Sequence, residues 1–128
     1  MAEEKLFEGK LKGWMKSIGI YPAGYDEEKM VVTPIGWYTK IWGGGFQKSG
    51  IPDIIACVKG QFVSIEVKAQ NGRPSELQEL NTGRIRNSGG HGVFLYPSGF
   101  GQFKADVTSM LEQLKYDSFC HQLQEVYK

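Results

Sequence analysis

Cysteine, net charge and long apolar runs are all scarce in this chain of 128 residues. Cys57 and Cys120 are the two cysteines, and they lie far apart without a C-x-x-C pair. This pattern argues against a disulfide framework and favours reduced thiols. No apolar run approaches the roughly 20 residues that span a bilayer, and the amino terminus is charged from Glu3 onward. We therefore expect a cytoplasmic protein that is neither secreted nor anchored in a membrane.

The net charge of +1 removes overall basicity as a sign of a nucleic-acid partner. Any DNA must therefore meet a local patch of cations. The sequence also lacks a G-x-x-x-x-G-K-[ST] motif, so the glycines at positions 43 to 45 do not indicate a nucleotide-hydrolysing loop. Repeats, low-complexity segments and breaks in composition are absent as well. The length suits one domain, and we expect residues 1–128 to form it.

Periodicity predicts the elements of the first half of the chain. Apolar residues at three- and four-residue spacing predict a helix over residues 3–18 that ends at Gly19. Residues 30–42 are rich in β-branched and aromatic types, although Pro34 and Gly36 predict an edge strand, a bulge or an interruption there. Two further β-rich runs flank Lys59-Gly60, which suits the tight turn of a hairpin.

The second half continues with a helix, a strand and a helix. Ser75-x-x-Gln78 forms a capping box that opens a helix through about residue 87. Residues 92–96 read as a buried strand, and helical spacing resumes from Phe100 towards the C-terminus. The predicted fold is an α/β domain whose central mixed sheet is flanked by helices, with the strand at 92–96 returning beside the hairpin.

The predicted hairpin places two carboxylates opposite each other. If Lys59 and Gly60 form the turn, Asp53 pairs with Glu66 on a face that also carries Lys68, while the other face is wholly apolar. Like charges in this position destabilise a sheet. A divalent cation between them explains the pair better than Lys68 alone, and magnesium suits oxygen ligands. The alternative is a solvated pair of strand-end acids with an ordinary lysine partner.

Phosphodiester hydrolysis is the chemistry that fits this set of residues. A metal held by Asp53 and Glu66 would activate a water molecule and polarise a phosphate. Lys68 would orient that water or stabilise the negative charge that develops on the phosphate. Each of the three residues thus has a distinct predicted role.

The same residues carry a family resemblance. Pro52-Asp53 followed by Glu66-x-Lys68 resembles the PD-(D/E)XK nuclease superfamily. Gly50-Ile51, Gly72 and Ser75-x-x-Gln78 make the chain look like the stand-alone VRR-NUC domains, compact phage and bacterial nucleases related to Holliday-junction resolvases. The resemblance spans roughly residues 4–97 and is most specific over residues 50–78. It implies a nuclease-like domain working in the cytoplasm of a bacterial or phage-infected host cell.

The resemblance also implies a metal site. Mg²⁺ is the expected cofactor, with Mn²⁺ as a substitute, held by Asp53, Glu66 and the backbone carbonyl of Val67. Such nucleases add a carboxylate from the first helix, for which Glu8, directly or through a water, is the first choice and Glu4 the reserve. Gln78 resembles the helical glutamine that these enzymes place near the site. Its other interpretation is the capping partner of the preceding serine, and both roles are compatible.

The substrate and partners also follow from the resemblance. Lys40, Lys48, Ser49 and Arg73 lie beside the hairpin and are candidates for contacts with DNA phosphates, or else solvated surface residues. The expected substrate is branched DNA such as a four-way junction, cut by a homodimer. The alternatives are a flap or single-strand nuclease, a nickase, and a non-catalytic adaptor. The intact pair of acids with its lysine speaks against the adaptor.

Overall fold

The computed structural model describes residues 2–42, 50–116 and 123–128. They form three helices and six strands, with two short 3-10 turns, and four of the strands follow one another between the first two helices. The helices are α1 Ala2–Ile18, α2 Glu76–Asn87 and α3 Phe100–Tyr116; the strands are β1 Ile20–Pro22, β2 Gly36–Lys40, β3 Ile54–Val58, β4 Gln61–Val67, β5 His91–Leu95 and β6 Val126–Tyr127. None of the helices in these ranges has the length and apolar character needed to cross a membrane.

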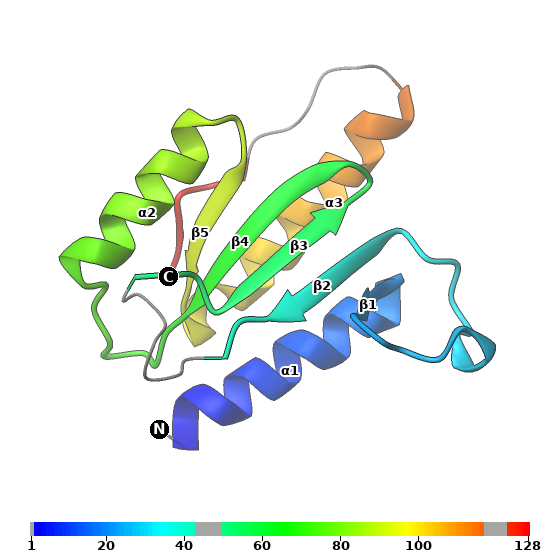
Figure 1. The fold of residues 1–128 in the computed structure, drawn as a ribbon, viewed down its shortest axis with the longest axis horizontal. Helices are drawn as coiled ribbons and strands as arrows, with labels where there is room; N and C mark the ends of the chain where they lie inside the picture. The colour runs from blue at the N-terminus through cyan, green and yellow to red at the C-terminus, as the bar shows by residue number, and fades with distance from the viewer. Residues whose placement is uncertain (1, 43–49, 117–122) are drawn as a thin grey trace.

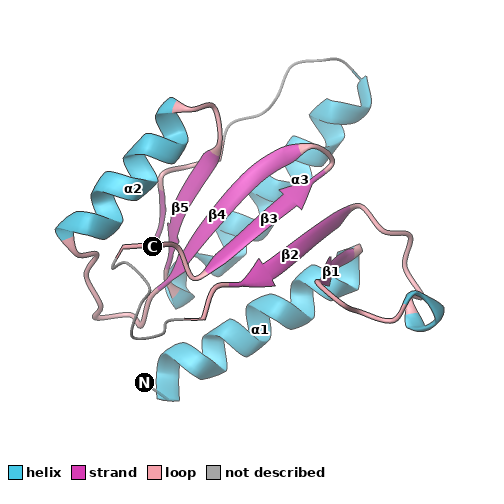
Figure 2. Cartoon of the chain, in the orientation of Figure 1, coloured by secondary structure: helices cyan, strands magenta, loops and turns pink. Residues whose placement is uncertain are grey.

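The strands form one mixed sheet in the order β1-β2-β3-β4-β5-β6. The pairs β2-β3 and β3-β4 are antiparallel, whereas the pairs β1-β2, β4-β5 and β5-β6 are parallel. α3 passes behind β3 and β4 in Figure 1, and α2 lies beside β5. Figure 2 shows the same layers coloured by type of element. The predicted class, an α/β fold with a mixed sheet flanked by helices, is confirmed.

The core lies between the sheet and the two helices α1 and α3. Phe7 and Phe100 meet edge to face with their ring centroids 5.4 Å apart, and Trp14 contacts Phe103 in the same way at 5.9 Å. The predicted helix over residues 3–18 is confirmed, but its apolar stripe is narrower than the spacing suggests. Leu6 is 71% exposed, because it lies on the solvent side of α1.

The hairpin between β3 and β4 has the predicted turn and register. Lys59 and Gly60 have φ angles of 49° and 84°, and two positive φ values in a two-residue loop match the twist of the flanking strands. Val58 pairs with Gln61, and Ile54 pairs with Ile65. The face predicted to be apolar is buried throughout; its members are Ile54, Ala56, Val58, Val63, Ile65 and Val67.

Two strands were missing from the predicted element order. β1 has three residues and β6 has two, and both join the sheet by parallel pairing with distant segments, which short sequence runs do not reveal. The strand expected over residues 30–42 is confined to β2, which begins after Pro34, so the interruption was right. The edge position was wrong, because β1 covers the outer side of β2.

Candidate active site

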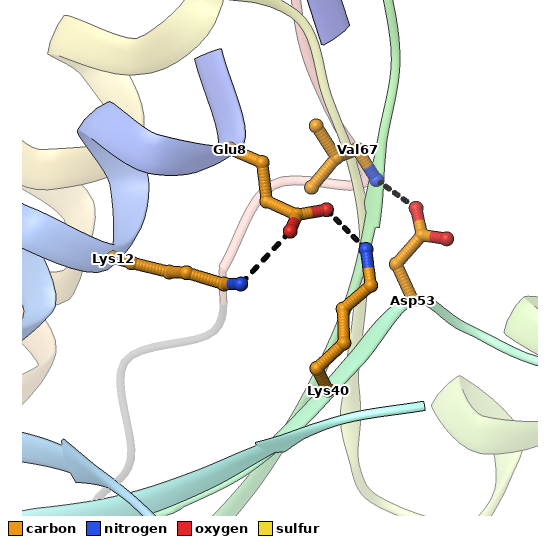
Figure 3. Close-up of polar contacts among 5 residues, drawn as sticks. All are labelled: Glu8, Lys12, Lys40, Asp53 and Val67. Carbon is orange, nitrogen blue, oxygen red and sulfur yellow. Dashed lines mark hydrogen bonds and ion pairs between the residues drawn. The ribbon is translucent and has the colours of Figure 1, made fainter. Parts of the chain in front are cut away.

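Asp53 is held where two strands of the sheet meet. It directly precedes β3, so the register of the hairpin places it opposite Glu66 near the end of β4. One carboxylate oxygen, Oδ2, accepts a hydrogen bond of 2.8 Å from the amide of Val67, the last residue of β4 (Figure 3). Its backbone carbonyl accepts another, of 2.7 Å, from Ile41 just after β2. The side chain of Asp53 is therefore held by β4 and its main chain by the residue after β2.

Gly50 allows the loop that carries Asp53 to pack against α2. Gly50 has a φ angle of 86°, and a Cβ atom there would lie 2.6 Å from the backbone carbon of Leu77. Any side chain would have to push the loop and the helix apart. The Nδ2 amide of Asn81 donates a hydrogen bond of 3.1 Å to the carbonyl of Gly50 and closes the contact. The close contact with α2 therefore explains why the Gly-Ile-Pro-Asp run begins with glycine.

Glu66 is a buried acid with one oxygen in use. The side chain is 4% exposed, and its Oε1 atom accepts a hydrogen bond of 3.2 Å from Nε2 of Gln78. Oε2 is buried and accepts no hydrogen bond from a described residue. Burial, the negative charge of Asp53 and a hydrogen bond that protonated Glu66 makes with the Asp53 carboxylate raise the pKa of Glu66 from 4.5 to about 8, although Lys68 acts in the opposite direction. Without a further cation, this carboxyl is mostly protonated at neutral pH.

Gln78 joins the acid, the lysine and the start of α2. Its Oε1 atom accepts hydrogen bonds from Nζ of Lys68 at 2.7 Å and from the amide of Ser75 at 2.9 Å. The backbone N–H of Gln78 donates to Oγ of Ser75 at 3.1 Å, which completes the capping box. The capping role of Gln78 is confirmed, and the same side chain also contacts Glu66 and Lys68, whereas its role in catalysis stays a prediction. The helix cap therefore also positions Glu66 and Lys68.

Glu8 lies between two lysines. Its Oε2 atom is 2.9 Å from Nζ of Lys12, and its Oε1 atom accepts a hydrogen bond from Lys40 of β2 (Figure 3). Burial alone would raise the pKa of Glu8, but the two ammonium groups outweigh it and the pKa is lowered. Lys40 therefore forms an ion pair within the protein, and 22% of its side chain is exposed. A contact between Lys40 and DNA stays a prediction.

The other acids near the start of α1 have different surroundings. The negative charge of Glu4 contributes to the raised pKa of Glu66, so the reserve candidate lies within electrostatic reach of the buried acid. Oε1 of Glu3 accepts a hydrogen bond of 2.8 Å from the amide of Gln70, in the loop after β4. The start of α1 is thus tied to the same end of the sheet as Asp53. Sequence reasoning missed the partners of Glu8, although the four-residue spacing to Lys12 is a signal for one of them.

The remaining predicted residues are less informative. Arg73 is exposed in the loop between β4 and α2, and Lys48 and Ser49 lie outside the described residues. Within the described ranges, no group of three or more histidine, cysteine, aspartate or glutamate side chains is arranged to hold a metal. The described carboxylates that face each other at the site are those of Asp53 and Glu66. Any cation there would need water or substrate oxygens to complete its shell.

Comparisons of the chain with protein-family models, with curated proteins and with solved structures each found no match. The fold and the site geometry are therefore the basis on which a function is argued. The most informative feature is the buried Glu66, whose second carboxyl oxygen accepts no hydrogen bond from the residues that the structure describes.

Proposed function

We propose that this protein is a metal-dependent DNA endonuclease of the PD-(D/E)XK type, similar to VRR-NUC domains, that hydrolyses phosphodiester bonds. One observation carries the proposal. Glu66 is buried opposite Asp53, keeps one oxygen that accepts no hydrogen bond from a described residue, and lies beside Lys68. A glutamine would fill this position at lower cost if no cation or proton were needed, because a buried acid beside a like charge is destabilising.

The residues at this position fit a magnesium ion. Mg²⁺ is usually bound by one or two carboxylates, waters and substrate phosphate, and Asp53 and Glu66 supply two carboxylates on one face. By resemblance, the carbonyl of Val67 would join them, and Mn²⁺ would substitute for Mg²⁺. When bound, the ion would lower the pKa of a coordinated water and neutralise charge on the phosphate. Its positive charge would also offset the repulsion between the two acids.

The surrounding side chains have supporting roles in this proposal. Gln78 occupies one oxygen of Glu66 and leaves Oε2 for the cation. The same amide oxygen holds the ammonium of Lys68, which would donate to a phosphate oxygen or hold the attacking water. Glu8 would keep α1 against β2 through Lys40, and Glu4 is the better placed of the two to reach the metal through a water.

Branched DNA and a homodimer complete the proposal by resemblance. With a net charge of +1, affinity must come from local cations such as Lys68 and Arg73. A two-fold dimer would supply one site for each of two equivalent strands of a four-way junction. Contacts with phosphates would position the DNA without reading its sequence.

The proposal is tested by incubating the purified protein with end-labelled four-way, flap, single-stranded and fully paired DNA, each with Mg²⁺, Mn²⁺ or EDTA. We expect cleavage of branched DNA with either metal and none with EDTA. Glu66→Gln should remove cleavage, whereas Glu112→Gln on α3, whose side chain is 57% exposed, should not. Cleavage that persists in EDTA, or in the Glu66→Gln protein, would contradict the proposal.

A further inference from the structure

The sheet face that carries the two acids is only partly covered. Figure 1 shows α2 beside β5, and no described helix lies over the viewer's side of β2 and β3. Three side chains form a row across this open area, because Trp37 pairs with Cys57 and Cys57 pairs with Phe62. Direct cross-strand partners point to the same face and lie about 5 Å apart. The row is therefore continuous across three strands.

Two members of this row are large aromatic residues that solvent can reach. Trp37 is 47% exposed and Phe62 is 44% exposed, and Cys57 between them is exposed as well. On the opposite face of the same strands, Tyr38 and Val63 are buried under α1 and α3. The aromatic rings are thus available to a flat apolar group that approaches from outside.

The row lies on the same face as the acids and close to them. Cys57 follows Asp53 by four residues, and Phe62 precedes Glu66 by four residues, so even spacing keeps all of them on one face. Four residues of strand correspond to about 13 Å. A DNA strand with a phosphate at the acids would pass over the row within a few nucleotides.

A hollow of about 340 Å³ adjoins the row between Phe62 and α2. Ile51, Ile85 and Phe62 give it an apolar lining, and the exposed Arg84 stands at its side. Arg84 forms no ion pair with a described residue, so its charge is available to an anionic partner. An apolar hollow with a free guanidinium suits a nucleotide, which has a flat base and a phosphate.

We propose that this surface binds unpaired nucleotides of the DNA substrate, with bases stacked on Trp37 and Phe62 and a phosphate paired with Arg84. The inference rests on the proposed nuclease function for the identity of its ligand. Bases inside a duplex are stacked on each other and do not offer their faces, whereas those of a single-stranded arm do. The preferred substrate is then branched DNA with a single-stranded arm, ahead of a fully paired four-way junction.

A second copy of the chain suits this surface less well. A buried aromatic side chain contributes about 150–250 Å², so two half-exposed rings offer roughly 200 Å². A stable interface needs about 800 Å² from each partner. The row is too small for that, but it suffices for one or two bases.

The first test measures DNA binding by fluorescence anisotropy in EDTA, so that cleavage plays no part. The ligands are a hairpin duplex with a single-stranded arm and the same duplex fully paired. We expect tighter binding of the armed DNA, and a five- to hundredfold loss in Trp37→Leu or Phe62→Leu, as for the loss of one stacked base. Leu6→Ala, an exposed apolar change on α1, is the control and should have no effect.

Equal binding of the two DNAs by the wild-type protein would overturn the inference, as would unchanged binding in both aromatic variants. Loss of a dimer in sedimentation, with DNA binding intact, would assign the row to contact between copies and overturn it too. Binding of armed DNA through these residues without any cleavage in Mg²⁺ would support the inference while the proposed enzymatic function fails. The two failures are therefore distinguishable.

The second test does not depend on a variant. Alkylation of Cys57 by iodoacetamide, followed by mass spectrometry of its own peptide, reports directly on the centre of the row. We expect the armed DNA to slow this reaction at least tenfold at saturation and the fully paired duplex to leave it unchanged. Undiminished alkylation in the presence of saturating armed DNA would overturn the inference.

Discussion

The metal-free protein should become less stable as the pH rises, because Glu66 must ionise in a buried position. Its folded pKa of about 8 exceeds the ordinary 4.5, so the folded state holds the proton more tightly than the unfolded state does. The stability from this proton is complete below pH 4.5 and is lost as the pH rises through 8. The difference between the two pKa values corresponds to a loss of at most roughly 5 kcal/mol in the free energy of unfolding, at about 1.4 kcal/mol for each pH unit.

Glu66→Gln isolates this effect, because the amide has the same shape but does not titrate. We expect the variant and the wild type to have similar unfolding free energies at pH 5, and the variant to be more stable by several kcal/mol at pH 9. Urea denaturation in EDTA at pH 5, 7 and 9 measures the difference. Other groups titrate in both proteins and cancel from it. Glu112→Gln, at an exposed position on α3, is the control and should follow the wild type.

Magnesium should reverse the loss in the wild type alone. A ligand at a hundred times its dissociation constant stabilises the folded state by about 2.7 kcal/mol. That gain should be seen at pH 9 in the wild type and should be absent from Glu66→Gln. Parallel stability profiles of the two proteins between pH 5 and 9 would refute the reasoning about the buried acid.

Three further predictions follow from the site. A carboxyl group must be ionised to bind a metal, so the apparent Mg²⁺ affinity measured by calorimetry should rise about tenfold for each pH unit below 8. An Mg²⁺ affinity that does not change with pH would exclude Glu66 as a ligand. Gln78→Leu and Ser75→Ala should each lower the free energy of unfolding by about 1 kcal/mol, because both remove the helix cap. Only Gln78→Leu should also slow DNA cleavage, by about 10- to 100-fold. Equal cleavage rates in the two variants would show that Gln78 acts only as a capping residue. Gly50→Ala should lower the unfolding free energy by about 2 kcal/mol more than Gly24→Ala. Both glycines have positive φ, but only at Gly50 would the added Cβ clash with a helix backbone. Equal losses in urea denaturation would contradict this.

The hairpin could be predicted from the sequence because its determinants are local. Lys59 and Gly60 define the turn, the alternation of apolar residues defines the buried face, and together they define the pairing of Ile54 with Ile65. The capping box of α2 is local in the same sense. The position of Gln78 near the site was expected from the family resemblance. The structure adds its hydrogen bonds with Lys68 and Glu66.

The missed features all depend on contacts between distant segments. β1 and β6 are too short to have a period and exist because β2 and β5 pair with them. The pairing of Glu8 with Lys40 joins residues 32 positions apart. Helix periodicity does not predict which acid on α1 reaches the sheet. Glu8 was preferred to Glu4 because its spacing to Gly19 is similar to the resolvase pattern, and the charge of Glu4 also reaches Glu66, so the choice between them stays a prediction.

The most direct test of the central claim compares the wild type with Asp53→Asn on branched DNA in Mg²⁺. Asparagine keeps an oxygen that can accept the hydrogen bond from Val67 but removes the charge a cation needs. We expect the wild type to cut, and Asp53→Asn to remain folded, to bind the same DNA and to cut at least a hundredfold more slowly. Cutting by Asp53→Asn at the wild-type rate, or no cutting of any DNA by the wild type, would contradict the assignment of this site as a nuclease centre.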